Sequence, residues 1–443
     1  MSPQGAAAQD QVLDAAAFDA VIQAYNSGRF EGLEADADLA RSIIPPGTGA
    51  LRDFSYVAPE IPLFDATKCV ACMECVNECP DTAILGKVTP EGRFKQCQAG
   101  ADAPTQATAE AHAVRGPKFG AAAAKRGLEP GVFSLYIDPS KCKGCGECVE
   151  VCGARDALKM VFKQAGTVEE SRRDFAFFQS LPATPLDYIG KSPADIMLDP
   201  QSLLYVGGAG SCMGCGEGTA LRLMLASTGR DYGRENIGII AATGCNTVFA
   251  STYPYNPYTT TWSNSLFENA PTYAMGVRLK WDQRGWGDKK LWVLGGDGAM
   301  NDIGFQALSR MLMSGMDIKV LVLDTQVYSN TGGQTSTASF TGQNAKMSMH
   351  GSAVSGKLER RKELVNIAMM HPGVFVAQTV AGNLNHFYKA IQGANAHKGP
   401  AVVVCYTTCQ PEHGVGDHLA AHQGKLAADC RVFPLMIFDP NKG

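Results

Sequence analysis

The stretch LWVLGGDGAMNDIG (residues 291–304) decides the fold class of this 443-residue chain. Its first half is an apolar run typical of a buried strand, and its Gly-Asp-Gly turn leads into a segment with helical spacing. Similar apolar runs alternate with helical segments along the rest of the chain. The runs are IGIIAATG (237–244), DIKVLVLD (317–324), VFVAQTV (374–380) and GPAVVVCY (399–406), and the helical segments are 302–315, 362–373 and 383–399. This alternation predicts an α/β domain with a parallel sheet covered by helices on both faces.

The composition allows a large folded core and gives no reason to expect a nucleic acid as a partner. Hydrophobic residues make up 45% of the chain and charged residues 19%, and the net charge is −4. The N-terminal sequence lacks a basic segment followed by an apolar run, which argues against a secretory signal. No apolar run approaches the about 20 residues that a membrane helix needs. We therefore expect a cytoplasmic protein that does not interact with a membrane.

Eight of the fifteen cysteines form two compact runs, which indicates metal clusters rather than disulfides. The runs CVACMECVNECP (69–80) and CKGCGECVEVC (142–152) both follow C-x2-C-x2-C-x3-C, the spacing of bacterial ferredoxins. In this arrangement the fourth cysteine of each run ligates the other cluster. We expect one [4Fe–4S] cluster on Cys69, Cys72, Cys75 and Cys152, and the other on Cys142, Cys145, Cys148 and Cys79. Two complete copies of the spacing disfavour a zinc site or free thiols, although Gly153 stands where the first run has Pro80.

The turn formed by Gly296, Asp297 and Gly298 resembles the motif that binds thiamine diphosphate through Mg²⁺. Mg²⁺ prefers oxygen ligands and is held by one or two carboxylates together with substrate phosphates, and Asp297 supplies such a carboxylate. The glycines let the backbone approach the phosphates, and the start of the following helix favours negative charge. A second strand runs into DTQVYSNTGGQ (324–334), which a strand–helix–strand unit brings beside the turn. Thr325 stands where the common thiamine motif has asparagine.

A separate cysteine pair lies in SCMGCGE (211–217). From its spacing alone, the pair Cys212 and Cys215 fits a redox disulfide, half of a zinc site or part of an iron–sulfur site. The local sequence does not decide among these three chemistries.

Together, these motifs resemble those of the 2-oxoacid:ferredoxin oxidoreductases, most closely the pyruvate:ferredoxin oxidoreductases. The resemblance spans about residues 60–443 and rests on SCMGCGE, AATGCNT (241–247), WSNSLFE (262–268), the Gly-Asp-Gly turn with DIG, DTQVYSNTGGQ and CYTTC (405–409). It implies that Asp297, the Thr325 side chain and the Val327 carbonyl bind Mg²⁺, and that Thr325 is the family's own variant. It also implies a catalytic position for Asn330 near the thiazolium. Glu217 is a further candidate for catalysis, and Thr243 and Asn264 are candidates for cofactor contacts.

The resemblance also gives the isolated cysteine pair a role. It implies a third [4Fe–4S] cluster, close to the thiamine, on Cys212, Cys215, Cys245 and Cys409. Three cysteines, Cys97, Cys405 and Cys430, then have no assigned role. The three C-terminal histidines, His413, His418 and His422, are interpreted as surface or packing residues.

The order of these features divides the chain into four expected parts. Residues 1–60 form an N-terminal arm with an amphipathic helix in DQVLDAAAFDAVIQAYNSG (10–28). Residues 61–165 form a small α+β ferredoxin-like domain for two [4Fe–4S] clusters, with a loop insertion at about 98–130. Residues 166–200 form a linker, and residues 201–443 form the domain for thiamine diphosphate, Mg²⁺ and the third cluster.

The activity that the resemblance implies is the oxidative decarboxylation of a 2-oxoacid, with thiamine diphosphate as electron sink and coenzyme A as co-substrate. Pyruvate is the first candidate substrate and 2-oxoglutarate the main alternative. The three clusters would pass electrons to ferredoxin or flavodoxin, in a reaction that a strong reductant could reverse. The pyrimidine-binding half of a thiamine enzyme is not recognised in this chain, so a second subunit is expected, in a dimer of heterodimers. A pure electron-transfer polyferredoxin and a non-oxidative thiamine decarboxylase are the alternatives from other classes.

Overall fold

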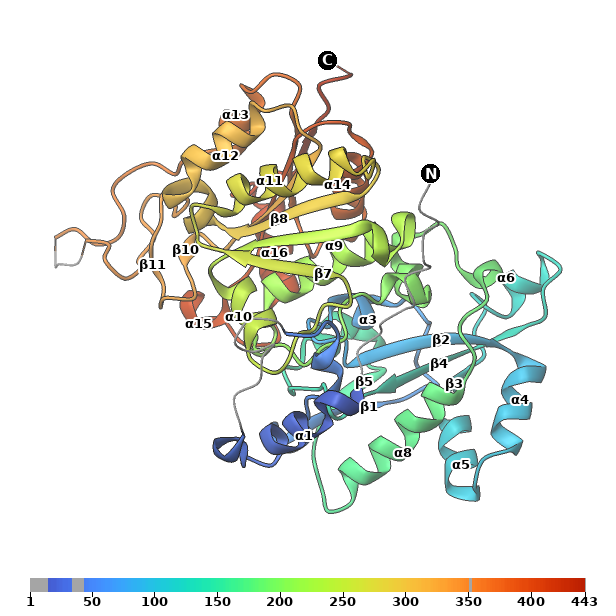
Figure 1. The fold of residues 1–443 in the computed structure, drawn as a ribbon. Helices are drawn as coiled ribbons and strands as arrows, with labels where there is room; N and C mark the ends of the chain where they lie inside the picture. The colour runs from blue at the N-terminus through green and yellow to red at the C-terminus, as the bar shows by residue number, and fades with distance from the viewer. Residues whose placement is uncertain (1–14, 34–43, 350–352, 443) are drawn as a thin grey trace.

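A seven-stranded sheet forms the centre of the C-terminal part of the chain (Figure 1). The computed structural model describes residues 15–33, 44–349 and 353–442. The sheet order is β14-β12-β13-β9-β8-β6-β7, and every neighbouring pair is parallel except β12 with β14. The strands are β6 (Ile237–Ala242), β7 (Thr261–Ser265), β8 (Lys290–Gly296), β9 (Ile318–Asp324), β12 (Phe375–Val380), β13 (Ala401–Tyr406) and β14 (Met436–Phe438). All residues of β6, β9, β12 and β13 are buried, which confirms the prediction of a sheet covered on both faces.

Helices cover both faces of this sheet, and each face has its own apolar core. The helices are α9 (Gly216–Tyr232), α10 (Cys245–Ser251), α11 (Ala270–Gln283), α12 (Phe305–Leu312), α13 (Leu364–Met369), α14 (Leu384–Ala396), α15 (Gln410–His413) and α16 (Ala420–Asp429). Successive side chains of a strand point to opposite faces. Trp292 and Leu294 of β8 therefore join the core that contains α9 and α14, while Val293 joins the core that contains α11 and α12.

The N-terminal part is built on two small sheets (Figure 1). Strand β1 (Glu60–Phe64) pairs with β5 (Leu158–Phe162), and β4 (Gly131–Ile137) lies between β2 (Ile84–Pro90) and β3 (Ala113–Val114). The short helices α3 (Glu74–Glu78) and α7 (Glu147–Cys152) follow the first two cysteines of each run and contain the third. The apolar core of this part is continuous with the α9 face of the large sheet, because Val88 and Leu135 belong to the same cluster as Trp292.

Two segments differ from the sequence expectation. The loop insertion expected at about 98–130 contains α5 (Ala103–Ala111) and α6 (Ala121–Ala124), after α4 (Glu91–Ala99). The linker expected at 166–200 contains α8 (Thr167–Ser180), whose Phe175, Phe177 and Phe178 are buried. These aromatic side chains pack with Phe94 and Tyr136 in a small core. Burial of an apolar face against the rest of the domain therefore makes these segments helical, although their composition is polar or rich in alanine.

The expected N-terminal helix is confirmed as α1 (Ala15–Asn26), whereas residues 1–14 and 34–43 of the expected arm lie outside the described residues. Ile22 of α1 packs against Tyr255 from the large domain. None of the helices in the described ranges is long and apolar enough to cross a membrane.

The loop before α9 requires a glycine at position 208, and we predict that Gly208→Ala destabilises the protein. Gly208 has φ +73°, and a Cβ there would collide with the backbone of Gly49. Overpacking and backbone strain each cost about 1–3 kcal/mol, so the midpoint of thermal unfolding should fall by about 2–6 °C in a chain of this length. The matched control is Gly127→Ala, because Gly127 has φ +76° but a Cβ added there would meet no atom within 4 Å. An equal fall in both variants, measured by circular dichroism, would contradict the collision.

Candidate functional site

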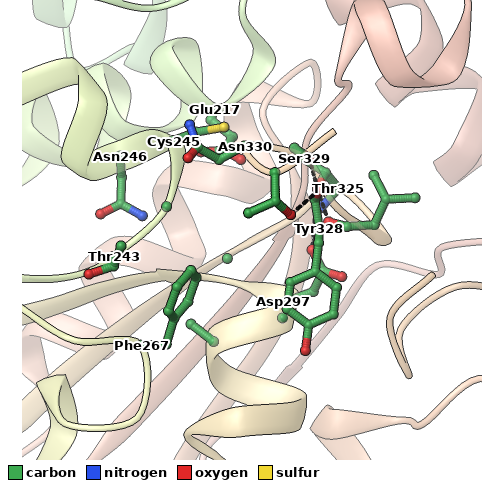
Figure 2. A pocket seen from close by; sticks show the side chains of 16 residues that line it. Glu217, Thr243, Cys245, Asn246, Phe267, Asp297, Thr325, Tyr328, Ser329 and Asn330 are labelled. Atoms are coloured by element: carbon green, nitrogen blue, oxygen red, sulfur yellow. Dashed lines mark hydrogen bonds between the residues drawn. The ribbon is translucent and has the colours of Figure 1, made fainter. Parts of the chain in front are cut away.

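Loops at the carboxyl edge of the large sheet enclose a pocket (Figure 2). Residues 243–246 follow β6, residues 296–299 include and follow the end of β8, and several residues of 325–331 follow β9. Glu217 near the start of α9 and Phe267 after β7 complete the lining. Because parallel strands end at the same edge, their three loops converge although they are far apart in the sequence.

Among the described residues, Asp297 is the carboxylate that the strand ends contribute to this lining, and the other two groups proposed for Mg²⁺, on Thr325 and Val327, line the same pocket. Asp297 is 1% exposed, and its Oδ1 accepts hydrogen bonds from the backbone N of Thr325 at 3.3 Å and from Thr325 Oγ1 at 3.2 Å. Thr325 Oγ1 also lies within hydrogen-bond distance of the Val327 carbonyl, at 3.0 Å. Ser336 Oγ donates to the second carboxylate oxygen. A carboxylate, a hydroxyl and a carbonyl within mutual reach are the hard oxygen donors that suit Mg²⁺.

Burial raises the pKa of Asp297 well above its ordinary value, and the nearby Asp324 raises it further. Two buried carboxyl groups without a cation repel each other and favour the protonated form. A divalent cation in contact with Asp297 would reverse this preference. The donor set therefore fits a bound Mg²⁺ on both its chemistry and its charge.

The second glycine of the turn is required by the packing of Tyr328. A Cβ on Gly298 would collide with the Tyr328 ring, which lines the same pocket. The Tyr328 hydroxyl donates to Asp302 at 3.0 Å, so the ring is fixed from its far end. The backbone of residues 297–299 can therefore lie close to any group that the pocket holds.

The structure brings most of the predicted cofactor contacts together, with one exception. Thr243 and Asn330 line the pocket beside Asp297. Asn264 does not line it; its Oδ1 accepts a hydrogen bond from Thr247 Oγ1 at 2.7 Å. Asn246, which the sequence motifs did not single out, lines the pocket with a buried Oδ1 that has no hydrogen-bond partner among the described residues. This unsatisfied acceptor is available to a donor on a bound molecule.

The four cysteines implied for the third cluster line one cavity, which adjoins the pocket. Cys212, Cys215, Cys245 and Cys409 surround a space of about 430 Å³. The cavity and the pocket share five lining residues: Glu217, Cys245, Thr325, Ser329 and Asn330. A group in the cavity would therefore lie directly beside a group in the pocket.

Glu217 lies at the junction of the pocket and this cavity. It is 5% exposed, its Oε2 has no hydrogen-bond partner in the described part of the chain, and burial raises its pKa to about 8. At neutral pH this carboxyl group is largely protonated and able to donate a hydrogen bond. A proton donor at this position lies within the lining of the pocket, and the catalytic role of Glu217 stays a prediction.

The two ferredoxin-type runs form two further cavities, in the crossed arrangement that their spacing indicates. Cys69, Cys72, Cys75 and Cys152 line a cavity of about 360 Å³, which we call the outer cavity. Cys79, Cys142, Cys145 and Cys148 line another of about 380 Å³, which we call the inner cavity. The crossing arises because α3 and α7 pack side by side, so that each carries its last cysteine toward the other run.

The chemistry of these cysteines fits metal clusters. Burial raises the pKa of Cys142 to about 12, and it raises the pKa of Cys75, Cys148 and Cys215 as well. Thiols in such surroundings ionise only when a metal displaces their protons. No group of three or more His, Cys, Asp or Glu side chains in the described ranges surrounds a single ion. Each thiolate of a cubane binds a different iron, so cluster ligands line a cavity instead of meeting at one point.

Two cysteines without an assigned role and the three C-terminal histidines lie outside the lining of the pocket and the cysteine cavities. Cys405 is fully buried in β13, whereas Cys430 is exposed. His413 stacks on Tyr406, and its Nε2 lies 2.8 Å from the Thr325 carbonyl, so it packs behind the pocket. His418 and His422 are exposed. The histidines thus agree with their interpretation as packing or surface residues.

Two family models match the chain. The thiamine pyrophosphate enzyme C-terminal TPP-binding domain matches residues 242–405, and the 4Fe-4S binding domain matches residues 62–85 and 135–154. These matches confirm the two predicted fold classes.

Several curated proteins are similar over most of this chain. A probable pyruvate-flavodoxin oxidoreductase of Escherichia coli (strain K12) is 29% identical, covering 92% of this chain and 38% of that protein. The pyruvate:ferredoxin oxidoreductase of Moorella thermoacetica is 28% identical, covering 95% of this chain and 40% of that protein. The chain thus spans about two fifths of the length of these relatives. Among solved structures, a 2-oxoglutarate:ferredoxin oxidoreductase from Magnetococcus marinus is 23% identical with a TM-score of 0.39, covering 46% of this chain and 65% of that one.

We predict that Asp297→Asn weakens the Mg²⁺-dependent binding of thiamine diphosphate by about tenfold or more, because hydrogen bonds and contacts to a charged group contribute about 1.5–3 kcal/mol. Isothermal titration calorimetry with and without Mg²⁺ measures this effect. The matched control is Asp288→Asn, which changes an exposed acid just before β8 that does not line the pocket. Equal binding by the wild type and Asp297→Asn would refute the assignment.

We predict that Cys409→Ser removes one cluster and leaves the other two. Iron analysis should give about eight irons per chain instead of about twelve, since each [4Fe–4S] cluster holds four. Cys405→Ala is the control, because Cys405 lies four residues away on the same segment but lines none of the three cavities. If Cys409→Ser keeps its full iron content, Cys409 is not a ligand.

Proposed function

We propose that this chain, which resembles the 2-oxoacid:ferredoxin oxidoreductases, is the thiamine- and cluster-binding subunit of such an enzyme. The reaction is the coenzyme A-dependent oxidative decarboxylation of pyruvate to acetyl-CoA and CO2, with ferredoxin or flavodoxin as electron acceptor. The observation that carries the proposal is the shared wall of Glu217, Cys245, Thr325, Ser329 and Asn330 between the thiamine-type pocket and the adjoining cysteine cavity. A decarboxylase without a redox step has no use for this contact.

The residues of the pocket hold and orient the reactants. Bound thiamine diphosphate supplies the electron sink for decarboxylation, and [4Fe–4S] clusters accept electrons singly. Asp297, the Thr325 side chain and the Val327 carbonyl hold Mg²⁺ and thereby the diphosphate. The buried Glu217 carboxyl would donate a hydrogen bond to a molecule held in the pocket, and its burial keeps water away from the wall shared with the cysteine cavity.

The three cavities support an electron path with a fixed order. The cavity of Cys212 adjoins the pocket, and Lys143 in the Cys142–Cys145 loop donates to the Ser211 carbonyl at 2.9 Å, immediately before Cys212. The cluster in the inner cavity is therefore second along the proposed electron path. The outer cavity is third, and Val70 in its lining is 54% exposed, which gives an external acceptor access.

We propose that a second polypeptide supplies the rest of the active site. The matched thiamine model covers a C-terminal TPP-binding domain, and the curated relatives are more than twice as long as their match to this chain. Large apolar side chains next to the pocket are exposed: Leu266 beside Phe267 is 62% exposed, and Ile303 at the end of the Gly298 turn is 54% exposed. We propose that the partner carries the pyrimidine-binding domain, covers these side chains and forms a dimer of heterodimers with this chain.

The decisive experiment is anaerobic purification of the chain with its co-expressed partner, followed by initial rates with pyruvate, 2-oxoglutarate, oxalate and indolepyruvate. We expect coenzyme A-dependent reduction of ferredoxin with pyruvate as the best substrate. A preference for 2-oxoglutarate would change the substrate but keep the class. Absence of thiamine diphosphate after denaturation would indicate an electron-transfer protein, and 2-oxoacid turnover by the chain alone would refute the need for a partner.

A further inference from the structure

Arg222 is a buried cation that lines neither the pocket nor any of the three cysteine cavities. It lies on α9 and is 2% exposed. Its Nη1 donates to the carbonyls of Val76 at 2.7 Å and Asn77 at 3.1 Å, and its Nε donates to Thr82 Oγ1 at 2.9 Å. All three acceptors belong to the segment 76–82, whose centre is Cys79 of the inner cavity. The guanidinium is therefore fixed against the backbone that carries one cluster ligand.

The described residues provide Arg222 with no ion-pair partner. Its Nη2 is buried and has no hydrogen-bond partner in the same ranges. Asp81, the nearby acid on this segment, is paired with Lys143 at 2.8 Å, with both side chains buried. Glu78 forms no ion pair with the guanidinium. Glu78 and Asp81 attract the guanidinium only from beyond ion-pair distance, so an anion directly beside Arg222 would stabilise its buried charge further.

Another buried arginine shows how the fold satisfies such a group elsewhere. Arg278 of α11 is also fully buried, and it pairs with Asp282 at 2.6 Å while donating to the carbonyls of Trp286 and Lys289. Arg222 has the same kind of backbone acceptors, but no carboxylate of the residues that the structure describes lies within ion-pair distance of it. The missing partner is thus specific to the surroundings of the inner cavity.

We propose that Arg222 is the counter-charge of the iron–sulfur cluster on Cys79, Cys142, Cys145 and Cys148, and that it raises the reduction potential of that cluster. This inference rests on the proposed function, because it requires the cluster. A cubane with four thiolate ligands is an anion, and the electron that it receives from the neighbouring cluster adds one more negative charge. A fixed cation in a buried site stabilises the reduced form more than the oxidised form.

The charges near the outer cavity should act more weakly. Arg155 pairs with Glu74 at 3.2 Å and Lys68 pairs with Asp156 at 2.7 Å, and all four side chains are partly exposed. Solvent screens such pairs, and each cation is already neutralised. We therefore expect Arg222 to raise the potential of the inner cluster more than Arg155 or Lys68 raises that of the outer cluster.

The test is a redox titration of the full chain, purified anaerobically and followed by electron paramagnetic resonance, with Arg222→Gln, Arg222→Lys and Arg278→Gln. In Arg222→Gln we expect the equilibrium constant for reducing one cluster to fall about tenfold, which is about 59 mV for one electron. Arg222→Lys should keep most of the potential because it keeps the charge, and Arg278→Gln should change none. Unchanged potentials in Arg222→Gln with full iron content would overturn the inference.

Unfolding temperatures of the iron-free and iron-loaded chains give a second readout where a variant loads iron poorly. Arg222→Gln should lower the unfolding temperature of the loaded chain more than that of the iron-free chain, since only the loaded chain loses an ion pair. Equal losses in both forms, or loss of all iron rather than about four irons per chain, would make Arg222 a purely structural clamp. If the wild type itself binds no iron, the proposed function fails and not this inference alone.

Discussion

The structure depends on the burial of α9 between the large sheet and the ferredoxin-type domain. Almost every residue of this helix is buried, and its first turn directly follows Cys215. One turn further on, Thr219 Oγ1 donates to the Glu78 carbonyl, and Arg222 then bonds the segment around Cys79. A single rigid helix thus links a cysteine of the cavity beside the pocket to a cysteine of the inner cavity. The distance between these two sites cannot change without unpacking the helix from both domains.

Burial also explains the electrostatics of the site. Folding alone removes water from these carboxyl groups and thiols. This desolvation raises the pKa values of Asp297, Glu217 and the buried cysteines. Metal ions that displaced the protons would recover the cost of desolvating Asp297 and the thiols. Glu217 Oε2 has no hydrogen-bond partner in the described chain, and burial raises the pKa of this carboxyl group to about 8, which favours its protonated form at neutral pH. The same desolvation therefore prepares ligands at some positions and a proton donor at another.

The parts of the site that could be predicted from the sequence depend on local spacing. The cysteine runs and the Gly-Asp-Gly turn are each contained in about a dozen residues, so their chemistry can be read before the fold is known. Ser336, which donates to Asp297, and Arg222, which bonds the Cys79 segment, lie far from their partners in the sequence and belong to no motif. Cys245 and Cys409 were found only through the family resemblance. Helix α8 was missed because its aromatic residues gain their burial from α4 and β4, a long-range contact that local composition does not encode.

The order of the strands explains why the pocket forms where it does. Strand β6 lies between β7 and β8 in the sheet. From β6 the chain passes first to its neighbour on one edge, β7, and then to its neighbour on the opposite edge, β8. The loops that leave β6 and β8 therefore diverge at the carboxyl edge and leave a crevice between them, which is where open α/β sheets bind ligands. Asp297 follows β8 and Cys245 follows β6, so the two sides of this crevice carry the residues proposed to bind Mg²⁺ and a cluster. The contact between the pocket and the cysteine cavity at Cys245 thus follows from the sheet topology.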